Sequence, residues 1–266
     1  MAADAQTPQP QNIILSGQRM HFWRGGAGPG LLLLHAAWGD AEMSWSSVWS
    51  QLSSSFMVIA PDLPGFGQSS VLPRPSLSAM AQLLRQLLDA LNVDRVITVG
   101  NSFGAAVAIQ FAGDFPHTAS QLVLVNGGYM PSISGLARKL VALPILNQGF
   151  RLLIRQLSFS SHALKRSFVD ASKLPAIFIE KILQNAPVYS KIAFDTIMNI
   201  TGPLAQPPVP TLLLWGAQDG LIPLKQAQSL QQSIPGAELI SIERAGHMPQ
   251  VERPEEFVAS IMGLRH

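Results

Sequence analysis

The stretch that decides the fold reads Val96-Ile97-Thr98-Val99-Gly100-Asn101-Ser102-Phe103-Gly104, and a small-residue run, 105–109, follows it. The apolar residues before Gly100 predict a strand, and the run after Gly104 predicts a helix. A G-x-S-x-G sequence at a strand-to-helix turn is typical of a nucleophile elbow, in which small neighbours let the serine side chain stand clear of the backbone. The pentapeptide alone also arises by chance, so its position between a strand and a helix carries the prediction. Ser102 is the candidate nucleophile.

Apolar runs alternate with helical patterns along most of the chain. Strands are predicted at residues 12–15, 20–23, 31–35, 56–60, 95–99, 121–126, 211–215 and 238–242. Helices are predicted at residues 47–52, 77–91, 105–111, 224–233 and 254–264. Continuous apolar strands indicate a sheet covered on both faces, and their alternation with helices indicates parallel pairing. We therefore expect an α/β fold with a mostly parallel eight-stranded sheet, whose first two strands form a hairpin.

Residues 131–203 interrupt this alternation, because they show helical patterns and no convincing strand. We expect a helical cap inserted between core strands, with residues 1–130 and 204–266 forming the core. The segment is strongly apolar. It carries nine Lys or Arg and three Asp or Glu, a net charge of +6, so the rest of the chain has a net charge of −4. An ordinary solvated helical subdomain accounts for both features. The alternatives are a lipophilic substrate tunnel and attraction to an anionic substrate or membrane surface.

The composition fits one large domain with an insertion. The chain has 266 residues, of which 47% are hydrophobic and only 13% are charged, with a net charge of +2. The absence of cysteine excludes disulfides and thiolate metal sites. Residues 1–12 lack the basic and apolar regions of a signal peptide, and no apolar run approaches the length of a membrane span. We expect a cytoplasmic protein, and nothing in the sequence resembles a nucleic-acid-binding motif.

A serine nucleophile needs a base, and His247 is the candidate among six histidines that show no metal-ligand spacing. It follows the last predicted strand, as Ser102 follows an earlier one, and loops after parallel strands converge on one edge of the sheet. Asp219 directly follows the strand at 211–215 and is the candidate acid that orients the histidine ring. Glu243 lies at a strand end and is the weaker alternative, whereas Asn126 cannot serve as an ionised acid.

An oxyanion intermediate needs two fixed donors. One candidate is the backbone N–H of Phe103, which follows the nucleophile, and the other is the N–H of Ala37 in the loop after residues 31–34. Trp38 and Met248 are the candidate substrate-binding residues. Trp38, Trp45 and Phe103 are otherwise interpreted as packing residues.

Taken together, these residues resemble the α/β-hydrolase superfamily. The resemblance covers nearly the whole chain and rests on residues 100–104, 215–223 and 245–257, together with a D-x-P-G-x-G-x-S loop at residues 62–69. It implies a Ser–His–Asp triad of Ser102, Asp219 and His247 in the chain order Ser…Asp…His, and no metal or organic cofactor. The motifs are specific for the fold and the triad but not for a substrate.

Two departures separate subfamilies. The family usually has His-Gly after the third strand, and this chain has His35-Ala36, so the oxyanion hole is either altered or tolerant of the methyl group. Haloalkane and epoxide hydrolases of this fold use Asp at the elbow, which Ser102 argues against. Carbon–carbon bond hydrolases of ring-fission products are similar at Gly-Asn-Ser, yet they usually carry Trp where this chain has Met248. They would also need a cap arginine for a substrate carboxylate, for which the chain offers Arg138, Arg151 and Arg155.

The sequence therefore predicts a serine hydrolase that acts on a small hydrophobic carboxylic ester, with thioesters and lactones as near relatives. Three alternatives remain open at this point. They are a carbon–carbon bond hydrolase with the same triad, a non-catalytic ligand-binding protein on the same fold, and association of the basic, apolar cap with a membrane surface.

Overall fold

The computed structural model of the chain describes residues 7–128, 140–141, 143–170, 174, 176–200 and 206–264. An eight-stranded sheet in the order β1-β2-β4-β3-β5-β6-β7-β8 forms its centre. The strands are β1 (Gln9–Leu15), β2 (Gln18–Gly25), β3 (Gly30–Leu34), β4 (Met57–Pro61), β5 (Val96–Asn101), β6 (Ala119–Val125), β7 (Thr211–Gly216) and β8 (Glu238–Ile242). β2 pairs antiparallel with β1 in the predicted hairpin and with β4, and the other pairs are parallel. The predicted mostly parallel α/β sheet is confirmed.

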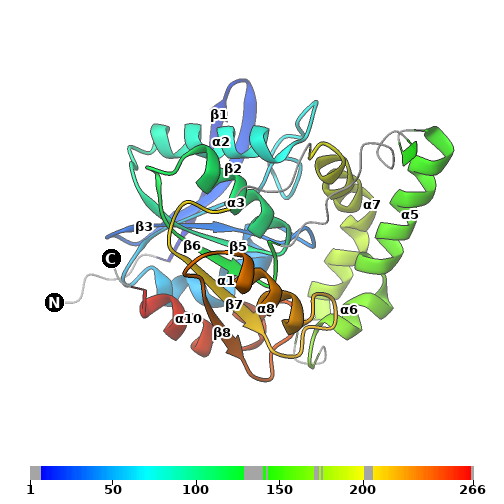
Figure 1. Ribbon diagram of the computed structural model, residues 1–266. Helices are drawn as coiled ribbons and strands as arrows, with labels where there is room; N and C mark the ends of the chain where they lie inside the picture. The colour runs from blue at the N-terminus through cyan, green and yellow to red at the C-terminus, as the bar shows by residue number, and fades with distance from the viewer. Residues whose placement is uncertain are drawn as a thin grey trace.

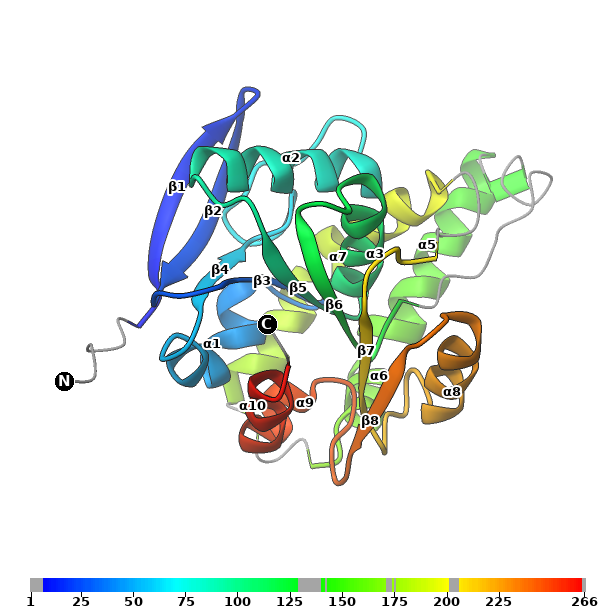
Figure 2. The same cartoon turned by 60° about the vertical axis from the view of Figure 1, so that its left-hand side comes forward.

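Helices cover both faces of this sheet (Figures 1 and 2). One face carries α2 (Leu77–Ala90) and α3 (Phe103–Asp114), and the other carries α1 (Ala41–Leu52) and α10 (Pro254–Met262). A further helix, α8 (Leu224–Ser233), packs on β7 and β8. The middle strands β3, β5 and β7 are buried along their whole length, whereas the edge strands β1 and β8 are largely exposed. Coverage of both faces therefore applies to the centre of the sheet.

Two helices differ most from the prediction. α1 begins at Ala41 instead of residue 47, because the Asp40 side chain accepts a hydrogen bond from the Met43 amide at 2.8 Å and caps the helix. Its buried stripe runs through Trp45 and Val48, so the true periodicity starts before the predicted helix. The single-turn helix α9 (Pro249–Glu252) was not predicted, because four residues are too few for a period of 3.6 to show.

Between β6 and β7 the described residues form helices and no strand. These helices are α5 (Pro144–Phe159), α6 (Ser161–Ser167) and α7 (Ala176–Met198). They lie together beside the sheet, with α5 on the outer side (Figure 1). The amide of Gly67 donates to the Tyr189 hydroxyl at 3.0 Å and so joins α7 to the core. The expected cap boundaries at residues 131 and 203 lie outside the described residues. Among the helices that the structure describes, none is long and apolar enough to cross a membrane.

Candidate active site

Ser102 occupies a strained turn between β5 and α3. Its φ of 53° and ψ of −109° lie in a region that residues other than glycine rarely adopt. The two flanking glycines have a steric explanation. A Cβ on Gly100 would stand 2.3 Å from the Gly104 carbonyl oxygen, and a Cβ on Gly104 would stand 2.3 Å from the Leu34 carbonyl oxygen. The G-x-S-x-G pattern is therefore a packing requirement of this turn.

The two expected oxyanion donors lie in different settings. Phe103 is the first residue of α3, and a first-turn N–H has no partner inside its own helix. The amide of Leu63 donates to Nε2 of buried His35 at 2.8 Å, so Nδ1 carries the proton and donates to the Ala36 carbonyl at 2.7 Å. Burial lowers the pKa of His35, which keeps this neutral arrangement. The backbone just before Ala37 is thus held by a histidine hydrogen bond.

Asp219 and His247 form a buried pair. Nδ1 of His247 lies 2.7 Å from Oδ2 of Asp219, and both side chains are almost fully buried. The loops after β7 and β8 bring them together, since the amides of Ala217 and Gln218 bond to the carbonyls of Ile242 and Ala245. The carboxylate accepts the Nδ1 proton, which leaves Nε2 as the free, basic nitrogen of the ring.

Three further hydrogen-bond donors hold the Asp219 carboxylate. Oδ1 accepts the amides of Leu221 at 2.7 Å and Ile222 at 3.0 Å, and Oδ2 accepts the side-chain amide of Asn126 at 2.7 Å. Burial by itself raises the pKa of Asp219, but the adjacent His247 and these hydrogen bonds outweigh it and hold the pKa below its ordinary value. Asp219 is therefore ionised at neutral pH.

Asn126 is a residue whose role the sequence did not reveal. The sequence excludes it as an ionised acid of the triad. In the structure its side-chain amide donates to Asp219, and its side-chain oxygen accepts the Gly216 amide at 2.9 Å. Its φ of 45° lies in the left-handed region, which asparagine tolerates better than most residues. An Asn directly after a buried strand was the available signal. Glu243, the weaker acid candidate, is exposed.

The structure brings Ser102 and His247 to the same edge of the sheet. The side-chain amide of Asn101 donates to the His247 carbonyl at 3.1 Å, which fixes the histidine backbone beside the residue that precedes the serine. Among the bonds between described residues, none joins the Ser102 hydroxyl to the histidine ring. Catalytic hydrogen bonds are often long before substrate binds and shorten in the complex with substrate.

Trp38 lies against the histidine, as expected of a residue near the site. Its ring centroid is 4.8 Å from that of His247 and 5.7 Å from that of Phe168, and its Nε1 donates to the Ser158 carbonyl of α5 at 2.8 Å. Met248 is buried in the core cluster, whereas Trp45 packs on Phe257 across the opposite face of the sheet. Of the aromatic candidates, Trp38 is thus adjacent to His247 and Trp45 is remote.

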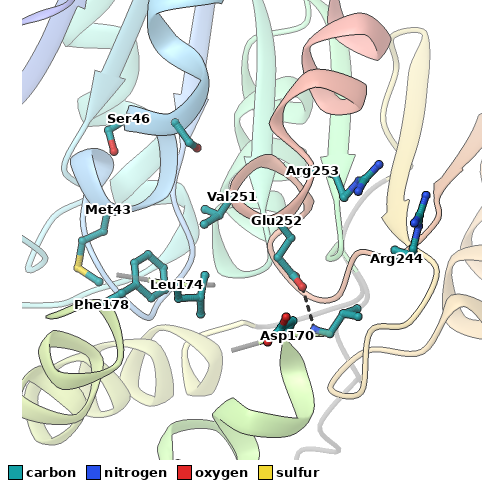
Figure 3. A pocket seen from close by; sticks show the side chains of 11 residues that line it. Met43, Ser46, Asp170, Leu174, Phe178, Arg244, Val251, Glu252 and Arg253 are labelled. Atoms are coloured by element: carbon teal, nitrogen blue, oxygen red, sulfur yellow. Dashed lines mark hydrogen bonds between the residues drawn. The ribbon is translucent and has the colours of Figure 1, made fainter. Parts of the chain in front are cut away.

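Glu252 joins the histidine loop to the segment after α6. Oε1 accepts the Gly246 amide and Oε2 accepts the Val169 amide, each at 2.8 Å. Burial raises the pKa of Glu252, although the backbone amides that it accepts act in the opposite direction. Glu252 also lines a cavity of about 660 Å³ with residues such as Met43, Phe178 and Arg244 (Figure 3). Among its described lining residues are none of Ser102, Asp219 and His247, so this cavity is separate from the Asp–His pair.

The other described residues that the sequence singled out lie away from the Asp–His pair or make structural contacts. Asp62, from the 62–69 loop, accepts the amides of Ala41 and Gln68 and lies 2.9 Å from Nδ1 of buried His21. Arg151 pairs with Asp195 of α7 at 2.8 Å, Arg155 is exposed, and Arg138 lies outside the described residues. Within the described ranges, no group of three or more His, Asp or Glu side chains is arranged to hold a metal ion.

Comparison with known proteins places this architecture in a family. Residues 29–254 match the family described as alpha/beta hydrolase fold, and the chain belongs to that family. It is 28% identical over 264 residues to Lipase 1 of Psychrobacter immobilis, covering 95% of this chain and 82% of that protein. It is also 28% identical over 277 residues to the 2-hydroxy-6-oxononadienedioate/2-hydroxy-6-oxononatrienedioate hydrolase of Paraburkholderia phymatum, covering 96% of this chain and 94% of that protein. Its fold is similar to that of a thermophilic esterase from Thermogutta terrifontis, with a TM-score of 0.77 and 27% identity over 96% of this chain and 97% of that one.

Proposed function

We propose that the protein is a serine hydrolase that cleaves carboxylic esters through an acyl-enzyme at Ser102. The observation that carries this proposal is the buried 2.7 Å contact between Asp219 and His247 at the sheet edge where Ser102 sits on its strained turn. A serine hydroxyl becomes a useful nucleophile only when a base removes its proton during attack. The Asp–His pair presents that base in a fixed tautomer.

In the proposed reaction, Nε2 of His247 takes the proton from Ser102 as its oxygen attacks the acyl carbonyl. The oxyanion is stabilised by the N–H groups of Phe103 and Ala37. The alcohol leaves with the proton from His247, and water activated by the same nitrogen then releases the acid. Asp219 stays ionised and stabilises the imidazolium. Removal of one oxyanion donor costs about 3 kcal/mol in related chemistry, and the reaction draws on no metal or organic cofactor.

The proposed substrate is a small hydrophobic ester, with thioesters and lactones as near relatives. Trp38 places aromatic surface beside the His247 ring, and Phe168 packs on Trp38. We propose that residues 131–203 form a cap that shapes the acyl pocket above this surface. The names of two similar proteins, a lipase and an esterase, support hydrolysis of esters.

A carbon–carbon bond hydrolase remains the second candidate, because a relative of equal identity carries that name. Such an enzyme would need a cap arginine for its substrate carboxylate. Arg151 is engaged with Asp195 and its guanidinium stacks over the Phe194 ring, which counts against that role. A non-catalytic ligand-binding protein is the candidate of another class. The strained backbone of Ser102 counts against it, because ligand binding alone does not require an exposed nucleophilic serine on a strained turn.

The test is hydrolysis of p-nitrophenyl esters from acetate to palmitate, with Ser102→Ala as the blank, together with labelling by a fluorophosphonate. We expect labelling and turnover in the wild type and neither in the variant, and the chain-length optimum would size the pocket. Labelling without ester turnover would favour the carbon–carbon bond hydrolase, to be checked by loss of absorbance of a ring-fission product. A folded wild type that is not labelled would favour the binding protein.

A further inference from the structure

Helix α5 carries its apolar side chains on the outside. Six of its large apolar residues have exposed fractions between 40% and 84%, namely Ile145, Leu146, Phe150, Leu152, Leu153 and Leu157, whereas Ile154 is half-buried and Phe159 is buried. The less exposed positions, 147, 151, 154 and 158, follow helical spacing and include Asn147 and Arg151. On a surface helix of a soluble protein the apolar stripe normally faces the core. Most of the apolar surface of α5 therefore faces away from the core.

Specific contacts fix this orientation. On the inner side, the Arg151 guanidinium pairs with Asp195 of α7 at 2.8 Å and lies 5.5 Å from the centre of the Phe194 ring. Two turns beyond, the Ser158 carbonyl accepts the Trp38 indole N–H. Rotation of α5 to bury its leucines would break both contacts. These six side chains of α5 therefore face outward. The helix itself lies on the outer side of α7 (Figures 1 and 2).

The exposed apolar residues form one continuous surface. Four of them, Ile145, Leu146, Phe150 and Leu153, line an open groove of about 340 Å³ together with Gly149. A contiguous exposed apolar patch marks an interaction site, because water contact with it is unfavourable. We call these residues, with Leu152 and Leu157, the α5 patch.

The positive charge of α5 and α6 indicates which partner the α5 patch binds. From Pro144 to Ser167 the chain has four basic residues and no acidic one. Arg151 is paired inward, and the other three, Arg155, Lys165 and Arg166, are exposed. A second copy of the chain would bring these positive charges together, which opposes self-association. An anionic lipid surface matches both the apolar face and the positive charge.

We propose that the α5 patch inserts into the headgroup region of an anionic bilayer while the rest of the chain stays in water. Leu153 and Leu157 supply apolar contact, and the positive charges of Arg155, Lys165 and Arg166 attract the chain to the anionic surface. This proposal is independent of the ester-hydrolase proposal, since it needs no reacting serine.

The test is co-sedimentation of the full chain with vesicles of phosphatidylcholine alone and of phosphatidylcholine with phosphatidylglycerol in equal parts. We expect binding to the anionic vesicles at least tenfold tighter than to the neutral ones. The double variant Leu153→Asp/Leu157→Asp should weaken binding at least tenfold, and Arg155→Glu should weaken it about fivefold or more. Val71→Asp is the matched control, because Val71 is exposed by 59% but lies outside the patch. Ser102→Ala should bind as the wild type does.

Each variant must first show wild-type near-ultraviolet circular dichroism and a wild-type unfolding temperature. Failure of the wild type to bind anionic vesicles would overturn the proposal, as would equal binding to both vesicle types. Equal loss in Val71→Asp and in the patch variant would overturn it as well. A wild type that elutes as a dimer, and a patch variant that elutes as a monomer without any vesicle binding, would replace the lipid with a second copy of the chain.

Discussion

The backbone amide of His247 donates to the carbonyl of Ser167 at 2.7 Å. Ser167 ends α6, so a residue of the helical segment holds the backbone of the candidate base directly. A Cβ on Gly246 would stand 2.1 Å from that same carbonyl oxygen, which explains the glycine before the histidine. The position of His247 is therefore set by the helical segment as well as by the sheet.

Glu252 also joins the His247 loop to the segment after α6, and its replacement tests how far this contact positions His247. Glu252→Ala removes the acceptor of the buried Gly246 amide, and an unsatisfied buried donor costs about 1–3 kcal/mol. We expect kcat for ester hydrolysis to fall about tenfold with little change in KM. Glu252→Gln keeps one acceptor oxygen and should retain an intermediate rate. Glu255→Gln, at an exposed site in α10, is the control. Equal rates in all three variants would show that Glu252 does not position His247.

The raised pKa of Glu252 gives a pH dependence with a definite sign. The folded protein holds the proton on this carboxyl more tightly than the unfolded chain does, because burial disfavours the charged form. Relative to Glu252→Gln, the wild type should gain stability as pH falls from 7 through the raised pKa. The gain is complete below the ordinary value of 4.5. Urea unfolding of both proteins between pH 4 and pH 7 measures it, and a difference that is constant with pH would contradict the prediction.

Asp219→Asn tests the Asp–His pair. The amide cannot stabilise an imidazolium and disturbs the ring tautomer, and the equivalent change in a serine protease lowers kcat about 10⁴-fold. We expect a loss of similar size in the hydrolysis of p-nitrophenyl esters, with labelling of Ser102 by a fluorophosphonate slowed in parallel. Glu243→Gln is the control, because Glu243 is exposed. A loss in Glu243→Gln as large as that in Asp219→Asn would reassign the acid.

Trp38 links the histidine ring to α5, and Trp38→Phe removes only part of that link. The variant keeps an aromatic ring but loses the N–H bond to the Ser158 carbonyl, a contribution of about 1 kcal/mol. We expect KM for long-chain esters to rise about fivefold while acetate hydrolysis changes little. Trp49→Phe, on the other face of the sheet against Trp23, should change neither. A uniform loss over all chain lengths would place the effect on His247 instead of on the acyl pocket.

The elbow glycines allow a stability test that is independent of function. Gly104→Ala places a methyl group against the Leu34 backbone, which cannot move aside, and overpacking of this kind costs about 1–3 kcal/mol. Gly149→Ala, in α5, has open space around its Cβ and should stabilise the helix by up to about 1 kcal/mol. Thermal unfolding of both variants measures the contrast. Similar unfolding temperatures would contradict the steric account of the elbow.

Much of the fold follows from local sequence. The strands and the elbow were predictable because burial on both faces gives continuous apolar runs, and because the G-x-S-x-G turn has a strict steric requirement. The convergence of Ser102, Asp219 and His247 on one sheet edge was also predictable, since parallel strands place their following loops together. The catalytic roles of these residues stay a prediction that the proposed assays test.

Other features depended on the tertiary structure. Asn126 and Asp219 are 93 residues apart, and no local pattern marks their hydrogen bond. Glu252 belongs to a sequence signature, yet its hold on Val169 depends on how the helical segment docks on the core. The sequence predicted a strongly apolar helical segment within residues 131–203, but it did not predict which side of each helix faces the core. The ion pair of Arg151 with Asp195 fixes the side of α5 that packs on α7, so the exposed leucines face away from α7. This orientation depends on a contact between two helices, which the sequence of one helix does not contain.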